Sequence, residues 1–235
     1  MDDHKNGSWR ADRRELLKMV AGGAAGAALL GACGSAGAQN PAPPPPATPD
    51  EALAALKAGN QRFFDQKPQV RSTEEIEEIW TSNASGQAPF ATVLGCADSR
   101  LAPELIFDQF LGSIFVVREA GNIADSPTNL GSLEYSQAVL GSKLVLVLGH
   151  TSCGAVRAAF QNATPGGNIQ AIVDAIKPGI AGSSTLEEAT VANVRAVKER
   201  IRAQSPLLRA AEGDGKIKIV GGVYTLTTGT VAFLD

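Results

Sequence analysis

The sequence predicts an α/β fold, with a mostly parallel central β-sheet flanked by helices and an N-terminal helical arm. Two observations carry this prediction. Short apolar runs suited to buried strands alternate with segments of helical periodicity, and this order is typical of layered folds built on a parallel sheet. One run, Lys143–Leu148, is continuously apolar after its first residue, as in strands covered on both faces.

The N-terminal arm is predicted from two helix-start patterns. Thr48 precedes Pro49 and two acidic residues, and apolar side chains then recur at helical spacing as far as Phe64, which indicates a capped helix. Ser72-Thr73-Glu74-Glu75 resembles a capping box. It predicts a second helix that continues through Trp80.

The remaining elements are expected to alternate along the chain. The predicted strands are Phe90–Gly95, Ile114–Arg118, Lys143–Leu148, Lys216–Val223 and Thr230–Leu234. The predicted helices are Pro103–Phe110, Asn129–Leu140, Ala155–Gln161, Ile169–Lys177 and Leu186–Ala203. Helices between successive strands are what the connections of a parallel sheet require.

Composition sets broad limits on function. The 235 residues are 44% apolar and 19% charged, as in an ordinary globular protein. The formal net charge is -3, so the chain has no global basic surface and nucleic acid is not an expected partner. Residues 50–235 are enough for one domain with a sizeable core.

Residues 1–38 resemble a twin-arginine (Tat) export signal. The pair Arg13-Arg14 precedes an apolar, small-residue run, Met19–Ala32, and a basic region followed by a short apolar one is the pattern of a signal peptide. The run is about fourteen residues long, too short for a stable membrane-spanning helix. We therefore expect an exported protein of the periplasm or cell envelope.

Two processing sites remain open in this segment. Leu30-Gly31-Ala32-Cys33 resembles a lipobox, in which Cys33 would carry a lipid and tether the protein to a membrane. Ala36-Gly37-Ala38 is instead a small-residue site, with cleavage after Ala38. The proline-rich residues 39–49 would follow as an extended linker, ahead of the domain at 50–235.

Three residues concentrate the metal-binding chemistry of the predicted domain. The chain has only three cysteines and two histidines, and the domain holds Cys96, His150 and Cys153. They follow the predicted strands Phe90–Gly95 and Lys143–Leu148, at the carboxyl ends where open α/β sheets bind ligands. Two thiolates and one imidazole form a catalytic type of zinc site, with the fourth tetrahedral position open for water.

The residues after each ligand add to this chemistry. Arg100 offers a fork that matches a carboxylate, so a paired Asp98 would stay ionised and accept a hydrogen bond from a zinc-bound hydroxide. Zinc lowers the pKa of bound water from 15.7 to about 7, which provides a nucleophile at neutral pH. Gly154 would open a helix whose N-terminus favours negative charge.

Cys96-Ala97-Asp98-Ser99-Arg100, followed by His150-x-x-Cys153, resembles the signature of β-class carbonic anhydrases. Further segments match the family over about residues 50–235: Pro89–Arg100, Pro103–Gln109, Phe115–Arg118, Ala120–Asn122, Gly131–Tyr135 and Gly222–Tyr224. The resemblance implies reversible hydration of carbon dioxide to bicarbonate and a proton. It implies one zinc ion per subunit, held by Cys96, His150 and Cys153, with Asp98 and Arg100 as catalytic dyad.

The resemblance also implies a substrate pocket and an oligomer. Gln87 matches the glutamine that orients substrate, and Phe115 and Tyr135 match the aromatic lining of the plant-like subgroup, whose resting site is open. In some members the aspartate leaves the arginine and binds zinc, which would make Asp98 a fourth ligand. The family forms dimers and dimers of dimers, so Gln87 and Tyr135 are expected at pockets shared by two chains. Glu119 departs from the pattern, since many members have asparagine there.

Two other functions stay open at this level. A hydrolase acting on carbon disulfide or carbonyl sulfide would use the same scaffold, and loops that narrow the entrance would distinguish it. A membrane-tethered zinc protein without turnover is suggested by Cys33 and the proline-rich linker. The presence of Asp98, Arg100 and Gln87 counts against that reading, because a purely structural zinc site needs none of them.

Overall fold

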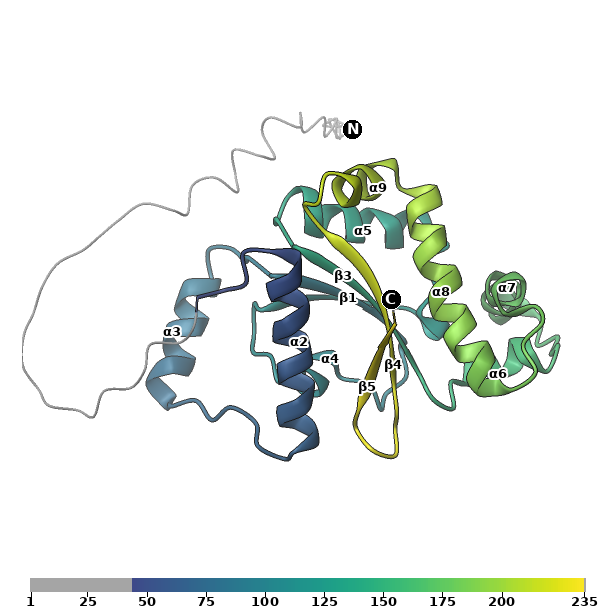
Figure 1. Cartoon of the computed structure of the whole chain (residues 1–235), viewed down its shortest axis with the longest axis horizontal. Helices are drawn as coiled ribbons and strands as arrows, with labels where there is room; N and C mark the ends of the chain where they lie inside the picture. The colour runs from purple at the N-terminus through teal and green to yellow at the C-terminus, as the bar shows by residue number, and fades with distance from the viewer. Residues whose placement is uncertain (1–43, 235) are drawn as a thin grey trace, which may run out of the picture.

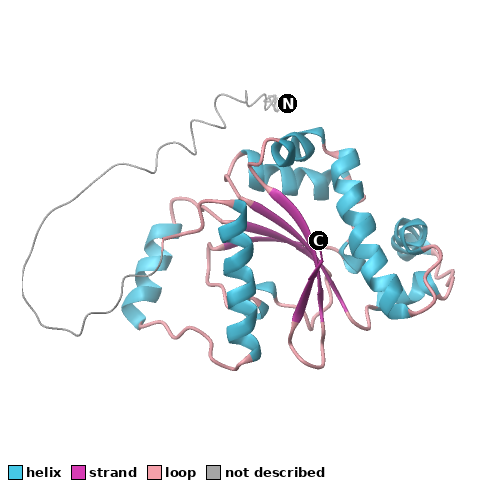
Figure 2. Cartoon of the chain, in the orientation of Figure 1, coloured by secondary structure: helices cyan, strands magenta, loops and turns pink. Residues whose placement is uncertain are grey.

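The computed structural model describes residues 44–234 of the chain. Their central element is a five-stranded β-sheet. Its strand order is β2-β1-β3-β4-β5, with the first four strands parallel and β5 antiparallel to β4 (Figures 1 and 2). The strands are β1 (Ala91–Gly95), β2 (Ile114–Arg118), β3 (Leu144–His150), β4 (Lys218–Tyr224) and β5 (Val231–Leu234). The predicted mostly parallel α/β sheet is confirmed.

Helices surround this sheet (Figure 2). The α-helices are α2 (Pro49–Phe64), α3 (Thr73–Asn83), α4 (Pro103–Ile106), α5 (Pro127–Ala138), α6 (Gly154–Phe160), α7 (Gly167–Ile176), α8 (Leu186–Gln204) and α9 (Pro206–Gly213). The described part of the chain also has two short 3₁₀ helices, η2 (Ala120–Asn122) and η3 (Lys177–Ile180). Within residues 44–234, none of these helices has the length and apolar character needed to cross a membrane.

The central strand β3 is buried on both faces, as its apolar run predicts. Leu144, Leu146 and Leu148 join a core that includes residues of α2 and α4. The alternate residues, Val145 and Val147, join a second core with residues of α5, α8 and α9. Successive side chains of a strand point to opposite faces, so the two cores lie on opposite sides of the sheet.

Both predicted helix starts of the N-terminal arm are confirmed. Thr48 and Glu51 form a capping box for α2, and Ser72 and Glu75 form one for α3. Helix α2 packs closely on the domain, since a Cβ at Gly59 would lie 1.7 Å from a backbone oxygen. Helix α3 has no buried residue and lies outside α2 in Figure 1. The expected signal segment 1–38, with Cys33 and Ala38, lies outside the described residues.

Three sequence predictions of the elements need correction. The helix expected over Pro103–Phe110 ends at Ile106, because the chain turns at Asp108, whose positive φ of 46° is not helical. The strand expected to end at Leu148 continues through His150. Helix α9 was not predicted: Ser205 ends α8 and its hydroxyl caps α9 directly, so no loop separates the two.

Candidate metal centre

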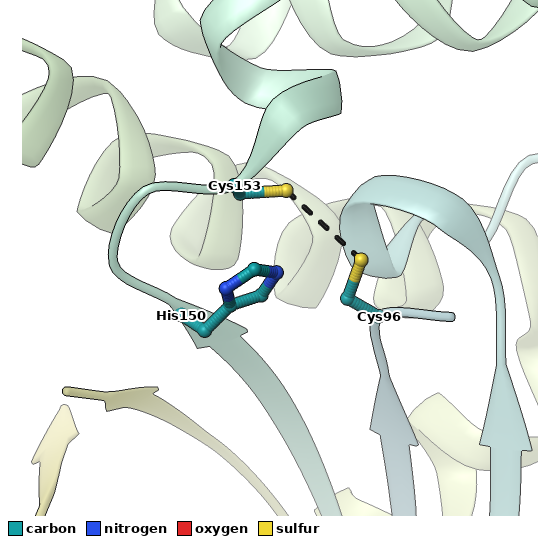
Figure 3. Close-up of side chains that lie close together, drawn as sticks. All are labelled: Cys96, His150 and Cys153. Atoms are coloured by element: carbon teal, nitrogen blue, oxygen red, sulfur yellow. Dashed lines mark hydrogen bonds between the residues drawn. The ribbon is translucent and has the colours of Figure 1, made fainter. Parts of the chain in front are cut away.

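The predicted ligands meet at the carboxyl ends of two neighbouring parallel strands. Strands β1 and β3 pair in parallel, with Gly95 opposite Leu148. Cys96 follows β1 directly, His150 ends β3, and Cys153 is the N-cap residue of α6. Their ligating atoms all lie within 4.8 Å of one another, and Figure 3 shows the three side chains converging. We call these three residues the ligand edge.

The donor atoms of the ligand edge fit a zinc ion. All three residues are buried, His150 completely, and the two Sγ atoms are 4.0 Å apart, within the span of two zinc–sulfur bonds of about 2.3 Å each. His150 Nδ1 lies 2.9 Å from the carbonyl oxygen of Thr151. A carbonyl only accepts, so Nδ1 carries the proton and Nε2 is free for a metal. Nε2 is buried without a hydrogen-bond partner.

The pKa values of the two thiols are shifted in opposite directions. A hydrogen bond from the Cys153 thiol lowers the pKa of Cys96 to about 4, with a further contribution from the Gly121 amide, 3.3 Å from the sulfur. The same hydrogen bond between the thiols, together with burial, raises the pKa of Cys153. The pair therefore shares one proton at neutral pH. A metal that takes both sulfurs as thiolates must displace that proton.

The tight turn between the ligands and a contact from α8 fix the site. The amide of Leu226 donates to the Thr151 hydroxyl at 3.1 Å, which ties the His150–Cys153 turn to the end of the sheet. Asn193, on α8, donates to the carbonyl of Gly121 at 2.9 Å. Gly121 has a φ of 74°, and a Cβ there would lie 2.6 Å from the Ile176 side chain, so both the backbone conformation and the space favour glycine at this position. Sequence reasoning missed Asn193, because one buried polar residue in mid-helix carries no distinctive pattern.

Asp98 and Arg100 form the pair that their spacing predicts. The Arg100 guanidinium donates from Nε to Oδ1 at 2.9 Å and from Nη2 to Oδ2 at 2.6 Å, and its backbone amide also reaches Oδ1. These hydrogen bonds hold the pKa of Asp98 well below its usual range. Asp98 Oδ2 lies 3.8 Å from His150 Nε2, so an ionised carboxylate stands directly beside the ligand edge.

Arg118, the last residue of β2, contacts the backbone of the same region. Arg118 donates from Nε to the Cys96 carbonyl at 3.0 Å and from Nη2 to the Asp98 carbonyl at 2.5 Å. Sequence reasoning did not assign Arg118 a role, although a charged residue at the carboxyl end of a predicted strand was the available signal. Glu119, where many family members have asparagine, accepts from the Asn129 side chain at 3.2 Å and so contacts the first turn of α5.

The predicted pocket residues lie apart from the ligand edge of their own chain. Phe115 and Tyr135 are together, with ring centroids 6.3 Å apart; we call them the aromatic pair. Phe115 is in register with Thr92, four positions before Cys96, or about 13 Å along the strand. Gln87 is exposed and precedes β1, at the opposite end of that strand. Gly154 is exposed and opens α6 beside Cys153, as predicted.

The fold and the donor set define an α/β protein with a candidate two-cysteine, one-histidine metal centre at the carboxyl edge of a parallel sheet. Comparison with known proteins then identifies the family. A family model described as carbonic anhydrase matches residues 91–231, more than half of the chain, and the chain belongs to this family. Proteins named as β-carbonic anhydrases are among the relatives and solved structures that the chain matches, which supports the β class.

The relatives cover most of the chain. It is 39% identical over 196 residues to carbonic anhydrase 2 of Mycobacterium tuberculosis, a match that covers 80% of this chain and 93% of the relative. A carbonic anhydrase of Mycolicibacterium smegmatis is 38% identical over 194 residues, a match that covers 79% of this chain and 93% of that relative. Among solved structures, a β-carbonic anhydrase of Coccomyxa in complex with acetazolamide superimposes with a TM-score of 0.61 at 28% identity, covering 77% of this chain and 86% of that chain.

Proposed function

We propose that the protein is a zinc-dependent carbonic anhydrase that reversibly hydrates carbon dioxide to bicarbonate and a proton. The observation that carries this proposal is the ligand edge with an ionised Asp98 beside it. A structural zinc site uses four protein ligands, whereas a catalytic one uses three and keeps a position for water. Membership of the carbonic anhydrase family supports the same reaction.

Cys96, His150 and Cys153 would hold the zinc ion, one per chain. When bound, zinc would act as a Lewis acid that lowers the pKa of a water molecule to about 7. The hydrogen bond from His150 Nδ1 to the Thr151 carbonyl fixes the imidazole ring and its tautomer. The burial of both sulfurs keeps bulk water away from the donor atoms.

Asp98 would act as the acceptor that orients the attacking oxygen. Arg100 keeps this carboxylate ionised and fixed through three hydrogen bonds. Asp98 would therefore accept a hydrogen bond from the attacking oxygen without taking its proton. The pairing with Arg100 supports an open resting site of the plant-like subgroup. Rotation of Asp98 away from Arg100 would bring it toward the metal as a fourth ligand, because Oδ2 is already 3.8 Å from His150 Nε2.

The substrate pocket would be completed by a second copy of the chain, in a homodimer or a dimer of dimers. Tyr135 is 39% exposed and lies with Phe115 away from the metal centre of its own chain, as does Gln87. These three residues would therefore serve the partner's site. A solved β-carbonic anhydrase of Sordaria macrospora with the same fold is described as tetrameric, which supports an oligomer here.

We further propose that the enzyme is exported through the segment 1–38 to the periplasm or cell envelope. The support is the twin-arginine pattern, and two mature forms follow from it: one lipidated at Cys33 and one cleaved after Ala38. Mass spectrometry of the mature chain distinguishes them, since the two forms begin at different residues. A mature chain that still begins at Met1 in the cytoplasm would refute export.

Stopped-flow measurement of carbon dioxide hydration on the zinc-loaded protein tests the main proposal. We expect a rate far above that of buffer, rising across pH 7–9 as water on the metal ionises. Hydrolysis of carbon disulfide and of carbonyl sulfide is measured in parallel. A rate equal to buffer for carbon dioxide, with turnover of a sulfur substrate, would favour the hydrolase instead; no turnover of any of the three would favour a binding protein.

A further inference from the structure

Arg118 holds the backbone of the loop that carries both a metal ligand and the catalytic carboxylate. We propose that Arg118 is a positioning residue, which clamps the Cys96 and Asp98 carbonyls and thereby aims the Asp98 carboxylate beside the metal. This inference rests on the proposed carbonic anhydrase function. It assigns a role to a residue outside the ligand set and outside the Asp98–Arg100 dyad.

The geometry follows from the register of the sheet. Arg118 is the last residue of β2 and lies opposite Gly95, the last residue of β1. Its side chain therefore starts beside the point where β1 ends and the loop to Arg100 begins. Nε donates to the Cys96 carbonyl at 3.0 Å, and Nη2 donates to the Asp98 carbonyl at 2.5 Å. One planar group thus spans three residues of the loop.

The loop has little else to fix its peptide planes. Beyond Gly95 it leaves the β-ladder, and its local hydrogen bonds are the turn from Leu101 to the Asp98 carbonyl at 3.0 Å and the contacts with Arg100. Arg100 is itself on the loop, so it moves with the segment that it is meant to fix. Arg118 is anchored on a strand, and it ties the loop to the sheet.

Metal binding and positioning are separable in this arrangement. Cys96 is buried directly after β1, and its sulfur accepts a hydrogen bond from the Gly121 amide, so the ligand atom has supports that do not involve Arg118. Asp98 is partly exposed, and its carbonyl is held by Arg118 directly. Loss of the clamp should therefore misplace Asp98 and leave zinc in the site. Lysine is a poor substitute, because a single ammonium lacks the fork that reaches two carbonyls.

The test compares Arg118→Met, Arg118→Lys and Asp98→Ala with the double variant Arg118→Met/Asp98→Ala. In Arg118→Met we expect one zinc per chain and a hydration rate reduced about ten- to hundredfold, as for other residues that orient metal-site groups. Arg118→Lys should recover only part of the rate. Adding Arg118→Met to Asp98→Ala should cost nothing further, because the two residues act as one unit. Arg209→Met, at an exposed position of α9, is the control with unchanged rate.

A readout that does not depend on turnover is the visible absorption of the cobalt-substituted protein. Arg118→Met should alter the cobalt bands, and the alteration should be absent when Asp98 is also replaced. An unchanged spectrum, a full hydration rate in Arg118→Met, or independent losses in the double variant would each overturn the positioning role. A wild-type zinc protein without hydration activity would instead refute the proposed function, so the two failures are distinguishable.

Discussion

The ligand edge and the aromatic pair differ in how completely one chain builds them. The ligand edge brings three donor atoms within 4.8 Å, in residues that are at most 4% exposed. The aromatic pair lies about 13 Å away along the sheet and leaves Tyr135 39% exposed. A single chain therefore supplies the metal chemistry, whereas the predicted substrate lining faces outward.

The position of each strand in the sheet explains this difference. β1 and β3 have a strand on each side and helices over both faces, so residues at their carboxyl ends are enclosed. β2 is one of the two edge strands of the described sheet, and an edge strand leaves one side open to another chain. Experiments that disturb one region and spare the other test this division.

The largest effect is expected from removing a sulfur of the ligand edge. Cys153→Ser replaces a soft thiolate with a hydroxyl, which is a poor zinc ligand, so both zinc content and hydration rate should fall to background. Metal analysis and stopped-flow assay measure the two quantities. Cys33→Ser is the matched control, because it removes a cysteine outside the domain and should keep both. Full zinc and full activity in Cys153→Ser would refute the ligand assignment.

A smaller effect is expected when the ligands stay and their neighbour changes. Asp98→Ala removes the oriented acceptor and should reduce the hydration rate about 10²-fold, with zinc content near one per chain. Asp98→Asn keeps the shape and removes the charge that Arg100 pairs with, so its rate should also fall. If Asp98→Ala hydrates carbon dioxide as fast as the wild type, Asp98 has no part in the mechanism.

The sequence predicted the ligand edge better than the elements around it. Cys96, His150 and Cys153 are the only residues of their kinds in the domain, and apolar strand runs precede them, so spacing and fold class were enough to bring them together. The end of the helix at Ile106 depends on Asp108, whose carboxylate is held by Arg62 46 positions earlier. Contacts of that range leave no local pattern.

The same limit applies to the supports of the site. Arg118 acts on two backbone carbonyls, and Asn193 acts on the carbonyl of Gly121. A backbone carbonyl is present at every residue, so the sequence does not show which one a side chain will reach. Side chains that recognise backbone are therefore found only when the register of the strands is known.

The aromatic pair should affect turnover and leave the metal in place. Tyr135→Ala removes one ring of the pair and is expected to lower kcat/KM about tenfold, since an aromatic contact contributes about 0.5–1.5 kcal/mol. Zinc content should be unchanged. Phe64→Ala removes a ring of similar exposure on α2 and serves as the control. A loss of zinc in Tyr135→Ala would show that the two regions are not independent.

The last effect concerns folding instead of turnover: a pH-dependent stability that belongs to the ligand edge alone. In chelator-treated protein the pKa of Cys96 is lowered from 9.0 to about 4, so between these values the unfolded chain binds a proton that the folded chain does not. Stability from this group therefore rises with pH across that window, is complete above about pH 9, and is lost as pH falls toward 4.

Urea unfolding of the chelator-treated protein at pH 6 and at pH 8 measures this term. The stability difference between wild type and Cys96→Ser should be larger at pH 8, because only the wild type gains from the thiolate. Tyr135→Phe should show the wild-type pH dependence, since it leaves the thiol pair unchanged. A Cys96→Ser difference that is equal at both pH values would mean that the thiols do not share a proton as their 4.0 Å contact indicates.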